Sequence, residues 1–308
     1  MMRRTFALLA CLATLGVTAC GSQTAASPAG EKVSITTAKG TVDVAKNPSR
    51  IVVMDYAVLD SMNALGVADK IVGLPTKTLP PFQSDFKGID NVGTLQEPDL
   101  EKIAALKPDA IIIGGRTAPK AAELAKVAPT IDLTFDATKF DESQKTNATA
   151  LGTLFDKQAE VDTKLAAIEK AEAETKALAA NAGTGIVLMT TGGKISAFGT
   201  GSRFGLVHSV LGVTPASTDL KVDAHGQAVS NEFIATTNPD RMFVIDRDAA
   251  VGQQGDSAQK LLDNALVNKT KAAQNKKITY LDGGRWYLLG SGLDNTLKMI
   301  DEVKAGLA

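Results

Sequence analysis

The chain has 308 residues with 33 Lys and Arg against 34 Asp and Glu, which gives a formal net charge of −1. This balance gives no sign of a nucleic-acid partner, because binding to phosphates needs an excess of basic residues. The length is enough for two lobes that each bury a hydrophobic core.

The N-terminus has the pattern of a secretory signal. Arg3 and Arg4 form a positive region, residues 6–16 form a short apolar run, and small residues precede Cys20. An apolar run this short is typical of a cleaved signal and not of a membrane span. The cysteine directly after small residues resembles a lipobox, which implies cleavage before Cys20 and a diacylglyceryl thioether on its sulfur. A plain signal peptide with an incidental cysteine is the alternative.

Both cysteines of the chain, Cys11 and Cys20, belong to this N-terminal segment. If Cys11 leaves with the signal and Cys20 carries lipid, the mature fold has no disulfide, cysteine metal site or thiol nucleophile. Residues 21–30 are small and polar, as in a flexible tether. No later apolar run is long enough to span a bilayer. We therefore expect a lipoprotein held at the extracytoplasmic face of a cell membrane.

The segment after the tether predicts alternating strands and helices. Alternation over 33–44 indicates a hairpin around Gly40, and the apolar run 110–113 is typical of a strand covered on both faces. Asp99 can cap a helix, and residues 75–90, with three prolines, predict a long loop. The expected strands are 50–54, 71–74, 110–113 and 130–135, and the expected helices are 57–65, 100–106, 119–127 and 141–151.

Residues 156–180 predict one long helix between the two halves of the chain. The stretch contains no Gly or Pro and has a thin apolar stripe. With a rise of 1.5 Å per residue, such a helix is about 37 Å long. We interpret it as a rigid connector between two lobes, and an ordinary surface helix is the alternative.

A similar order of elements returns after this helix. The expected strands are 185–189, 194–198, 242–245 and 278–281, and the expected helices are 204–211, 232–236, 257–267 and 293–305. His208 lies near the apolar face of its helix and is interpreted as a packed histidine. Both halves favour mainly parallel α/β lobes.

Two pairs of segments repeat between the halves. Residues 59–67 match 206–213 once one residue is dropped, and residues 101–109 match 232–240 without a gap. The second pair begins with Glu101 or Glu232 and leads through Pro-Asp into a buried strand. Two matches in the same order favour a duplicated lobe over chance.

Catalytic motifs are scarce. No Gly-x-Ser-x-Gly elbow, P-loop or dinucleotide-binding loop follows a predicted strand, and two histidines make a His-rich zinc site improbable. A metal-dependent hydrolase or oxidoreductase on a duplicated α/β scaffold is the alternative, but it needs a water-activating site that the sequence does not offer. We therefore expect a binding protein and not an enzyme.

Three arginines stand out because ligands of open α/β sheets bind beyond the carboxyl ends of the strands. Arg116 and Arg247 each follow a predicted strand, and Arg203 precedes a helix. Guanidinium groups donate hydrogen bonds in a fixed fork, so three together suit a polyanion, whereas separate surface salt bridges are the alternative. His225 and Tyr287 lie in predicted glycine-bounded loops and carry groups that can bind Fe(III), although their spacing does not pair them.

The chain resembles the class III substrate-binding lipoproteins of ABC importers, above all the subgroup that captures ferric catecholate siderophores (enterobactin- and petrobactin-type binders). The resemblance covers the mature chain and rests on IIIGGR (111–116), GSRFG (201–205), AHGQAVSNEFI (224–234), NPDRMFVIDR (238–247) and RWYLLGSGL (285–293). It implies two Rossmann-like α/β lobes joined by one long rigid helix. The expected parts are a signal peptide (1–19), lipidated cysteine and tether (20–32), N-terminal lobe (33–155), interlobe helix (156–181) and C-terminal lobe (182–308).

The resemblance also implies roles for individual residues. The family's arginine cluster maps onto Arg116, Arg203 and Arg247, its iron-ligating His and Tyr onto His225 and Tyr287, and its permease-docking glutamates onto Glu101 and Glu232. Tyr56 and Trp286 are further candidate ligand contacts. His225 and Tyr287 would fill the iron positions that a tetradentate siderophore leaves open.

The implied partners follow from these roles. The ligand would be a Fe(III)-siderophore, with no permanently bound cofactor, and the protein would be a monomer that delivers it to an ABC permease dimer with a cytoplasmic ATPase. Glu101 and Glu232 would dock on the two halves of the permease, although acids at helix starts are also favoured by the helix dipole. A receptor of the same class for a hydroxamate siderophore, haem or cobalamin is the alternative.

Overall fold

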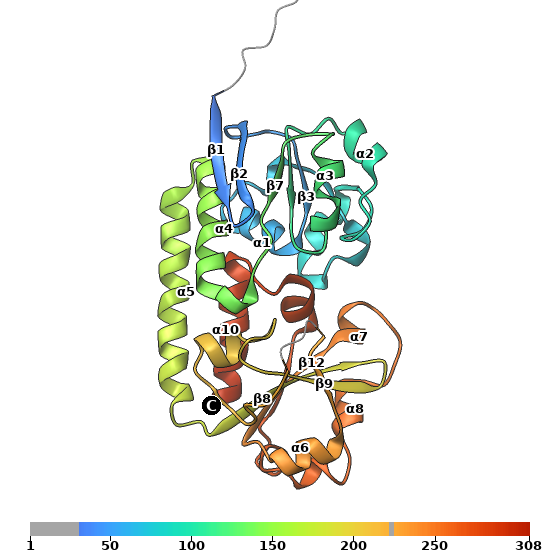
Figure 1. The fold of residues 1–308 in the computed structure, drawn as a ribbon, viewed down its shortest axis with the longest axis vertical. Coiled ribbons are helices and arrows are strands. Elements are labelled where there is room, and N and C mark those ends of the chain that lie inside the picture. The colour runs from blue at the N-terminus through green and yellow to red at the C-terminus, as the bar shows by residue number, and fades with distance from the viewer. Residues whose placement is uncertain (1–30, 222–224) are drawn as a thin grey trace, which may run out of the picture.

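The computed structural model of the protein describes residues 31–221 and 225–308. The expected signal peptide and the expected lipidation at Cys20 lie outside the described residues. Two α/β lobes follow each other along the long axis of the molecule, and one long helix runs beside both (Figure 1). The expected fold class, two α/β lobes joined by a long helix, is confirmed.

A five-stranded parallel sheet forms the centre of the N-terminal lobe, with the strand order β5-β4-β3-β6-β7. Its strands are β3 (Ile51–Met54), β4 (Ile71–Leu74), β5 (Asp90–Asn91), β6 (Ala110–Ile113) and β7 (Thr130–Asp132). Every residue of β3 and β6 is buried, so the apolar run of β6 is covered on both faces as expected.

The expected hairpin precedes this sheet, with β1 (Lys32–Thr37) antiparallel to β2 (Gly40–Ala45). The α-helices of this half are α1 (Tyr56–Ala64), α2 (Leu100–Ala105), α3 (Ala121–Leu124) and α4 (Phe140–Phe155). The loop expected over 75–90 contains two 3₁₀ helices, Thr76–Thr78 and Pro81–Gly88. Helix α4 continues past its expected end because Leu154 and Phe155 are buried in the core.

The C-terminal sheet has the order β11-β9-β8-β12-β13, with β10 paired to β8 outside this path. Its strands are β8 (Thr184–Thr191), β9 (Lys194–Phe198), β10 (Thr214–Pro215), β11 (Gln227–Val229), β12 (Arg241–Asp246) and β13 (Ile278–Leu281). The expected parallel core is present, but β9 and β11 pair antiparallel. Gly192 and Gly193, with φ of 54° and 73°, close the tight hairpin that turns β9 back along β8.

Short helices connect these strands. They are the π-helices Leu206–Val210 and Gly284–Leu289, the 3₁₀ helix Val267–Lys269, and α6 (Asn231–Thr237), α7 (Arg247–Ala250), α8 (Ala258–Leu262) and α9 (Lys271–Gln274). The prediction of a loop around Tyr287 was wrong, because this residue lies inside the π-helix Gly284–Leu289. Tyr287 is therefore held in place by a helix and not by a loop.

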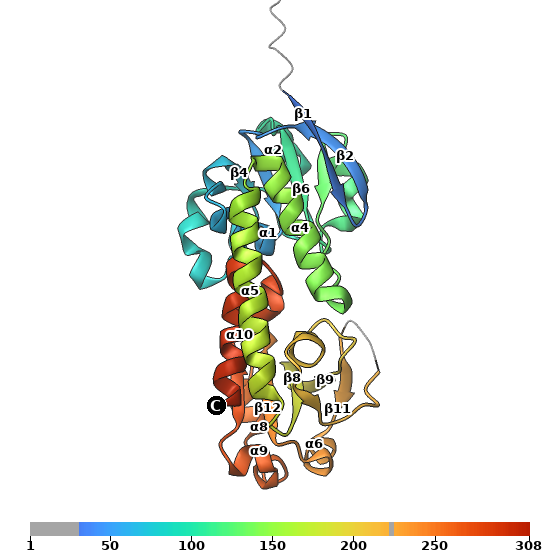
Figure 2. The ribbon, with the colours of Figure 1, turned by 90° about the vertical axis from the view of Figure 1, so that its left-hand side faces the viewer.

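Helix α5 (Gln158–Ala179) is the predicted long helix. It is separated from α4 by Asp156, whose φ of 54° is left-handed. Helix α5 lies beside α10 (Leu293–Leu307) in both views (Figures 1 and 2). Two ion pairs join these helices, Lys164–Asp294 at 2.6 Å and Lys304–Glu174 at 2.7 Å.

The repeated Pro-Asp has the same structural role in both lobes. Asp109 accepts hydrogen bonds at 2.9 Å from the main-chain N–H groups of Ser49 and Arg50, directly before β3. Asp240 accepts one at 2.8 Å from the N–H of Thr184, the first residue of β8. In each lobe the carboxylate ties the start of the central strand to its neighbour, which supports the predicted duplication.

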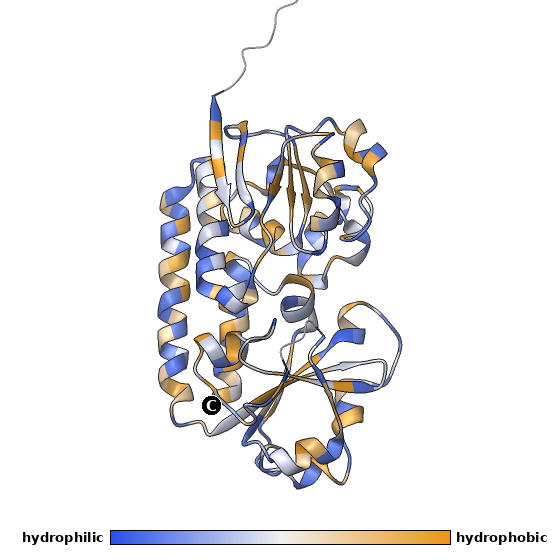
Figure 3. Ribbon diagram, in the orientation of Figure 1, coloured by the Kyte–Doolittle hydropathy of each residue, from blue (hydrophilic) through white to orange (hydrophobic). Residues whose placement is uncertain are grey.

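Hydrophobic residues concentrate on the strands of both sheets (Figure 3). The buried core includes β3 and β6 in one lobe and the middle of β8 and β12 in the other. Within the described ranges, no helix combines the length and apolar character needed to cross a membrane.

Candidate ligand-binding site

The three predicted arginines come from three separate loops. Arg116 follows β6 after two glycines, Arg203 lies between β9 and the π-helix Leu206–Val210, and Arg247 is the first residue of α7. A Cβ at Gly114 would lie 2.0 Å from the Oδ2 atom of Asp55, so a glycine is needed for the chain to turn toward Arg116 there.

Tyr287 is the point on which these arginines converge. The guanidinium carbons of Arg116, Arg203 and Arg247 lie 5.5, 4.7 and 5.5 Å from the centre of its ring. Arg116 and Arg203 also donate to the main-chain oxygen of Tyr287, at 2.5 and 3.0 Å. Arg116 donates in addition to the oxygen of Leu288 at 2.8 Å. The structure therefore brings together four residues that are far apart in the sequence.

This concentration of positive charge changes the ionisation of Tyr287. Burial raises the pKa of the phenol, but the hydrogen bond from Arg247 and the charges of all three arginines outweigh burial and hold the pKa below its usual value. Burial and the neighbouring charge of Arg116 lower the pKa of Arg203 to about 10, so Arg203 stays charged at neutral pH. The site thus combines three cations with a phenol whose pKa lies below its usual value.

Acceptors in its own lobe hold Arg247. Its Nη1 atom donates to Asp248 Oδ1 at 3.2 Å and to the side-chain oxygen of Gln253. Asp248 is buried, and its Oδ2 atom accepts a hydrogen bond from the N–H of Gly192 in the turn between β8 and β9. The carboxylate orients Arg247 and offsets part of the positive charge of the cluster.

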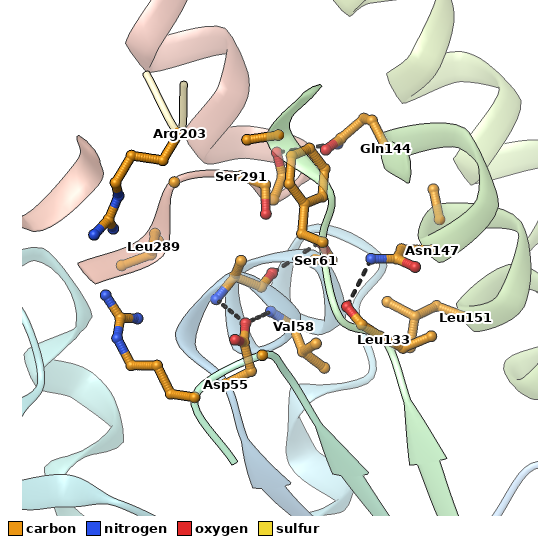
Figure 4. A pocket seen from close by; sticks show the side chains of 18 of the residues that line it. Asp55, Val58, Ser61, Leu133, Gln144, Asn147, Leu151, Arg203, Leu289 and Ser291 are labelled. Atoms are coloured by element: carbon orange, nitrogen blue, oxygen red, sulfur yellow. Dashed lines mark hydrogen bonds between the residues drawn. The ribbon is translucent and has the colours of Figure 1, made fainter. Parts of the chain in front are cut away.

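A chamber of about 430 Å³ lies beside Arg116 and Arg203. Elements α1 and α4, the chain after β7 and residues 286–292 enclose it. Figure 4 shows labelled polar side chains from these elements around one space, with Arg203 at its edge. They are Asp55, Ser61, Gln144, Asn147 and Ser291. Sequence reasoning missed all five, because no motif marks them and they meet only in the folded chain.

His225 lies in the loop before β11, next to the residues that the structure does not describe, and it is exposed. A Cβ at Gly226 would lie 2.6 Å from the ring of Phe198, so the glycine lets this loop approach the ring. Phe198 packs edge-on against Phe204 at 4.7 Å, and the Arg203 guanidinium lies 4.9 Å from the Phe204 ring. These rings connect the loop to the arginine cluster, and iron ligation by His225 stays a prediction.

Tyr56 and Trp286, the two further candidate contacts, both lie in the core. Tyr56 is fully buried, and its hydroxyl donates to the oxygen of Pro75 at 2.7 Å. Trp286 is also fully buried, and its Nε1 atom donates to Glu302 at 2.8 Å. Burial of Tyr56 leaves no surface for a ligand, whereas Trp286 is among the residues that line the chamber, and its contact with a ligand stays a prediction. His208 is packed as predicted, with Nδ1 2.8 Å from the oxygen of Val213.

Glu101 and Glu232 are exposed in the first turns of α2 and α6. The two helices belong to different lobes and lie far apart along the molecule (Figures 1 and 2). The side chains of Asp99 and Ser230 cap them by accepting hydrogen bonds from main-chain N–H groups. Each lobe therefore presents one of the two predicted docking glutamates at equivalent positions of the repeat.

Comparison with known proteins gives a consistent result. A family model described as periplasmic binding protein matches residues 51–283. The petrobactin-binding protein YclQ of Bacillus subtilis (strain 168) is 42% identical over 313 residues, covering 98% of each chain. The ferric-anguibactin-binding protein FatB of Vibrio anguillarum is 33% identical over 278 residues, covering 87% of this chain and 85% of FatB.

Solved structures show the same similarity. The crystal structure of YclQ has a TM-score of 0.87 and 43% identity, covering 90% of this chain and 99% of that one. The periplasmic catecholate-siderophore binding protein VctP from Vibrio cholerae has a TM-score of 0.82 and 30% identity, covering 89% and 100%.

Proposed function

The chain belongs to the periplasmic binding protein family, and we propose that it captures a ferric siderophore of the catecholate type and delivers it to an ABC permease for iron uptake. Family membership makes it a binding protein and not an enzyme. Three relatives that are named for binding petrobactin, ferric anguibactin and a catecholate siderophore support this ligand class.

The convergence of three guanidinium groups on Tyr287 is the observation that carries the proposal. A ferric tris-catecholate carries about three negative charges, and removing it from water is costly unless opposite charges meet it. Arg116, Arg203 and Arg247 supply three positive charges, and each guanidinium has five N–H donors in a fixed fork. A neutral ligand would leave these three positive charges without a counter-charge on the ligand.

Tyr287 and His225 extend the proposal to the iron atom itself. The lowered pKa of Tyr287 favours its phenolate, which is a hard oxygen donor suited to Fe(III). His225 lies at an exposed loop position, and an imidazole nitrogen is a group that can bind Fe(III). A tetradentate siderophore leaves two of the six iron positions free, and these two side chains would occupy them. The iron arrives and leaves with the ligand as cargo.

The remaining parts of the chain have proposed roles in delivery. A lipid on Cys20 would hold the protein outside the membrane, and residues 20–32 would act as its tether. The protein would act as a monomer. Its two lobes, residues 33–155 and 182–308, would be joined by residues 156–181 and would enclose the ligand between them. Glu101 and Glu232, one exposed on each lobe, would dock on the two halves of a permease dimer whose ATPase lies in the cytoplasm.

Calorimetric titration with a panel of complexes tests the ligand class. We expect ferric catecholates to bind much more tightly than ferric hydroxamates, haem or cobalamin. Charge-removing variants Arg116→Met and Arg247→Met should weaken ferric catecholates while leaving the fold intact by circular dichroism. Tight binding of a hydroxamate, haem or cobalamin without binding of any ferric catecholate would replace the proposed ligand by the alternative.

A further inference from the structure

The chamber beside Arg116 and Arg203 differs in chemistry from the arginine cluster at its edge. Arg116 and Arg203 line one side of the chamber with guanidinium N–H donors, whereas the polar side chains in the rest of the lining are amides, a carboxylate and hydroxyls. The available atoms on those polar side chains decide what the chamber can bind. Their hydrogen bonds within the protein reveal which atoms are available.

The two amides on α4 have committed their N–H groups to main-chain oxygens. Asn147 Nδ2 donates to the oxygen of Leu133 at 2.8 Å, and Gln144 Nε2 donates to the oxygen of Gly292 at 3.2 Å. A carbonyl can only accept, so each bond fixes which end of the amide faces the main chain. In the described part of the chain, no donor meets Asn147 Oδ1 or Gln144 Oε1, so both oxygens remain available as acceptors.

The side chains from α1 add to this acceptor character. Asp55 uses its Oδ1 atom to accept from the N–H groups of Ala57 and Val58, at 2.9 and 3.1 Å. Its Oδ2 atom has no donor among the described residues. The Ser61 hydroxyl donates to the oxygen of Ala57 at 2.9 Å and accepts from the N–H of Leu293 at 3.2 Å, so one lone pair of its oxygen remains. Ser291 retains a hydroxyl that can donate or accept.

We infer that this chamber receives an amine-bearing arm of the siderophore, while the iron-chelating end stays at the arginine cluster. The inference rests on the proposed function, because it assigns the part of the same ligand that does not bind iron. An amine donates hydrogen bonds to the free oxygens of Gln144 and Asn147 and to the carboxylate of Asp55. An anionic catecholate is attracted instead to Arg116 and Arg203 on the other side of the chamber.

The dimensions and the surroundings agree with an arm of this kind. A volume of about 430 Å³ has room for a chain of several methylene and amine groups. Leu133, Phe135 and Leu151 supply apolar wall for the methylene groups. The site thus has two ends of opposite polarity, which orients a ligand with one anionic and one cationic end.

Three synthetic ferric complexes separate the two proposals. The first is a bis-catecholate whose linker carries a secondary amine arm, the second has a methylene in place of that amine, and the third is ferric catechol without an arm. The wild-type protein should bind the amine ligand about tenfold more tightly than the methylene analogue, as expected for hydrogen bonds to buried acceptors. Binding of the arm-free complex reports on the arginine cluster alone.

Two variants locate the source of the preference. Asn147→Leu and Gln144→Met each remove a free amide oxygen and should reduce the preference for the amine toward equal affinity. The readout is the ratio of the affinities for the amine ligand and the methylene analogue, measured in each variant and in the wild-type protein. Lys145→Met is the matched control, because Lys145 lies between these residues on α4 but is exposed and lines a different groove. Thermal unfolding checks that each variant is folded, and either folded variant suffices for the test.

The outcomes distinguish the inference from the function on which it rests. Equal affinity of the wild-type protein for the amine and methylene ligands, with tight binding of both, overturns the inference alone. A preference that persists in Asn147→Leu and in Gln144→Met also overturns it. Failure of the wild-type protein to bind any of the three ferric complexes overturns the proposed function instead.

Discussion

The carboxylate of Asp60 in α1 accepts a hydrogen bond from the main-chain N–H of Asn295 in α10 at 3.0 Å. It accepts a second from the N–H of Asp294 at 2.9 Å, so a side chain of the N-terminal lobe caps the last helix of the chain. Gly292 makes this approach possible, because a Cβ there would lie 2.6 Å from Asp60 Oδ2. The lobes are therefore joined by this contact as well as by α5, which restrains their relative movement.

Stability should depend on pH through Asp60. Burial raises the pKa of Asp60 to about 6 despite its two N–H partners, from 3.8 in the absence of the fold. A raised pKa means that the folded state holds the proton of Asp60 more tightly than the unfolded state does. The stabilisation of the fold by this proton is therefore complete below about pH 4 and is lost as the pH rises through 6. Wild type should therefore lose on the order of 2 kcal/mol relative to Asp60→Asn between about pH 4 and pH 7.

Urea unfolding of both proteins at several pH values measures this difference. The Asp60→Asn protein serves as the reference, because the other acids contribute equally to both curves. A difference in the free energy of unfolding that stays constant over this range would contradict the raised pKa of Asp60.

Tyr287 should be the first tyrosine to ionise in an alkaline titration of the ligand-free protein. The chain has three tyrosines, and burial raises the pKa of both Tyr56 and Tyr280. The arginines lower that of Tyr287. Ultraviolet absorption of phenolate should show one early transition that Tyr287→Phe removes and Arg247→Met moves to higher pH. An early transition that survives Tyr287→Phe would show that another group is responsible.

Some of this site was predictable from the sequence for a definite physical reason. Arg247 comes directly after the carboxyl end of a buried strand and Arg116 follows another after two glycines, and such ends gather at one edge of a parallel sheet. Asp109 and Asp240 accept hydrogen bonds from main-chain N–H groups, and each carboxylate thereby fixes the start of a strand in its lobe. This shared role explains why the repeat could be recognised in the sequence. These features depend on local pattern and on duplicated topology.

Other features depend on contacts between distant segments and left no local signal. The π-helix around Tyr287 turns its main-chain oxygen toward Arg116 and Arg203, and glycine-rich flanks had predicted a loop. Gln144 and Asn147 look like ordinary polar residues of a helix until α4 packs beside the chain after β7. Tyr56 was misassigned because its burial depends on Pro75 and Thr78, which lie in a later loop.

His225→Ala and Tyr287→Phe should discriminate between siderophore classes. Tetradentate ferric complexes leave two iron positions open, so losing either side chain should weaken them by at least about tenfold, the equivalent of one lost interaction of 1.4 kcal/mol. Hexadentate complexes already fill the iron sphere and should change little. Calorimetry with one ligand of each class measures both effects. Equal losses for the two classes would mean that neither residue binds iron.

Glu101→Ala combined with Glu232→Ala should abolish uptake and leave ligand affinity unchanged. The two glutamates are exposed at helix starts in different lobes, away from the arginine cluster, so their removal alters docking and not binding. Uptake of radioactive iron by cells and calorimetry on purified protein separate the two properties. Glu142→Ala, an exposed glutamate on α4, is the matched control and should transport normally. A fall in ligand affinity in the double variant would contradict the docking role.

The emission of Trp286 tests the central claim most directly. Trp286 is the only tryptophan of the chain, it is buried, and it directly precedes Tyr287 at the arginine cluster. A ferric catecholate absorbs light strongly. When it is bound at the arginine cluster, it should quench this emission, and the quenching should saturate during a titration. The account predicts that ferric catecholates quench the emission of the wild-type protein. In Arg203→Met, the quenching should saturate only at a much higher ligand concentration. Absence of quenching by every ferric catecholate, together with tight binding of haem or cobalamin, would contradict it.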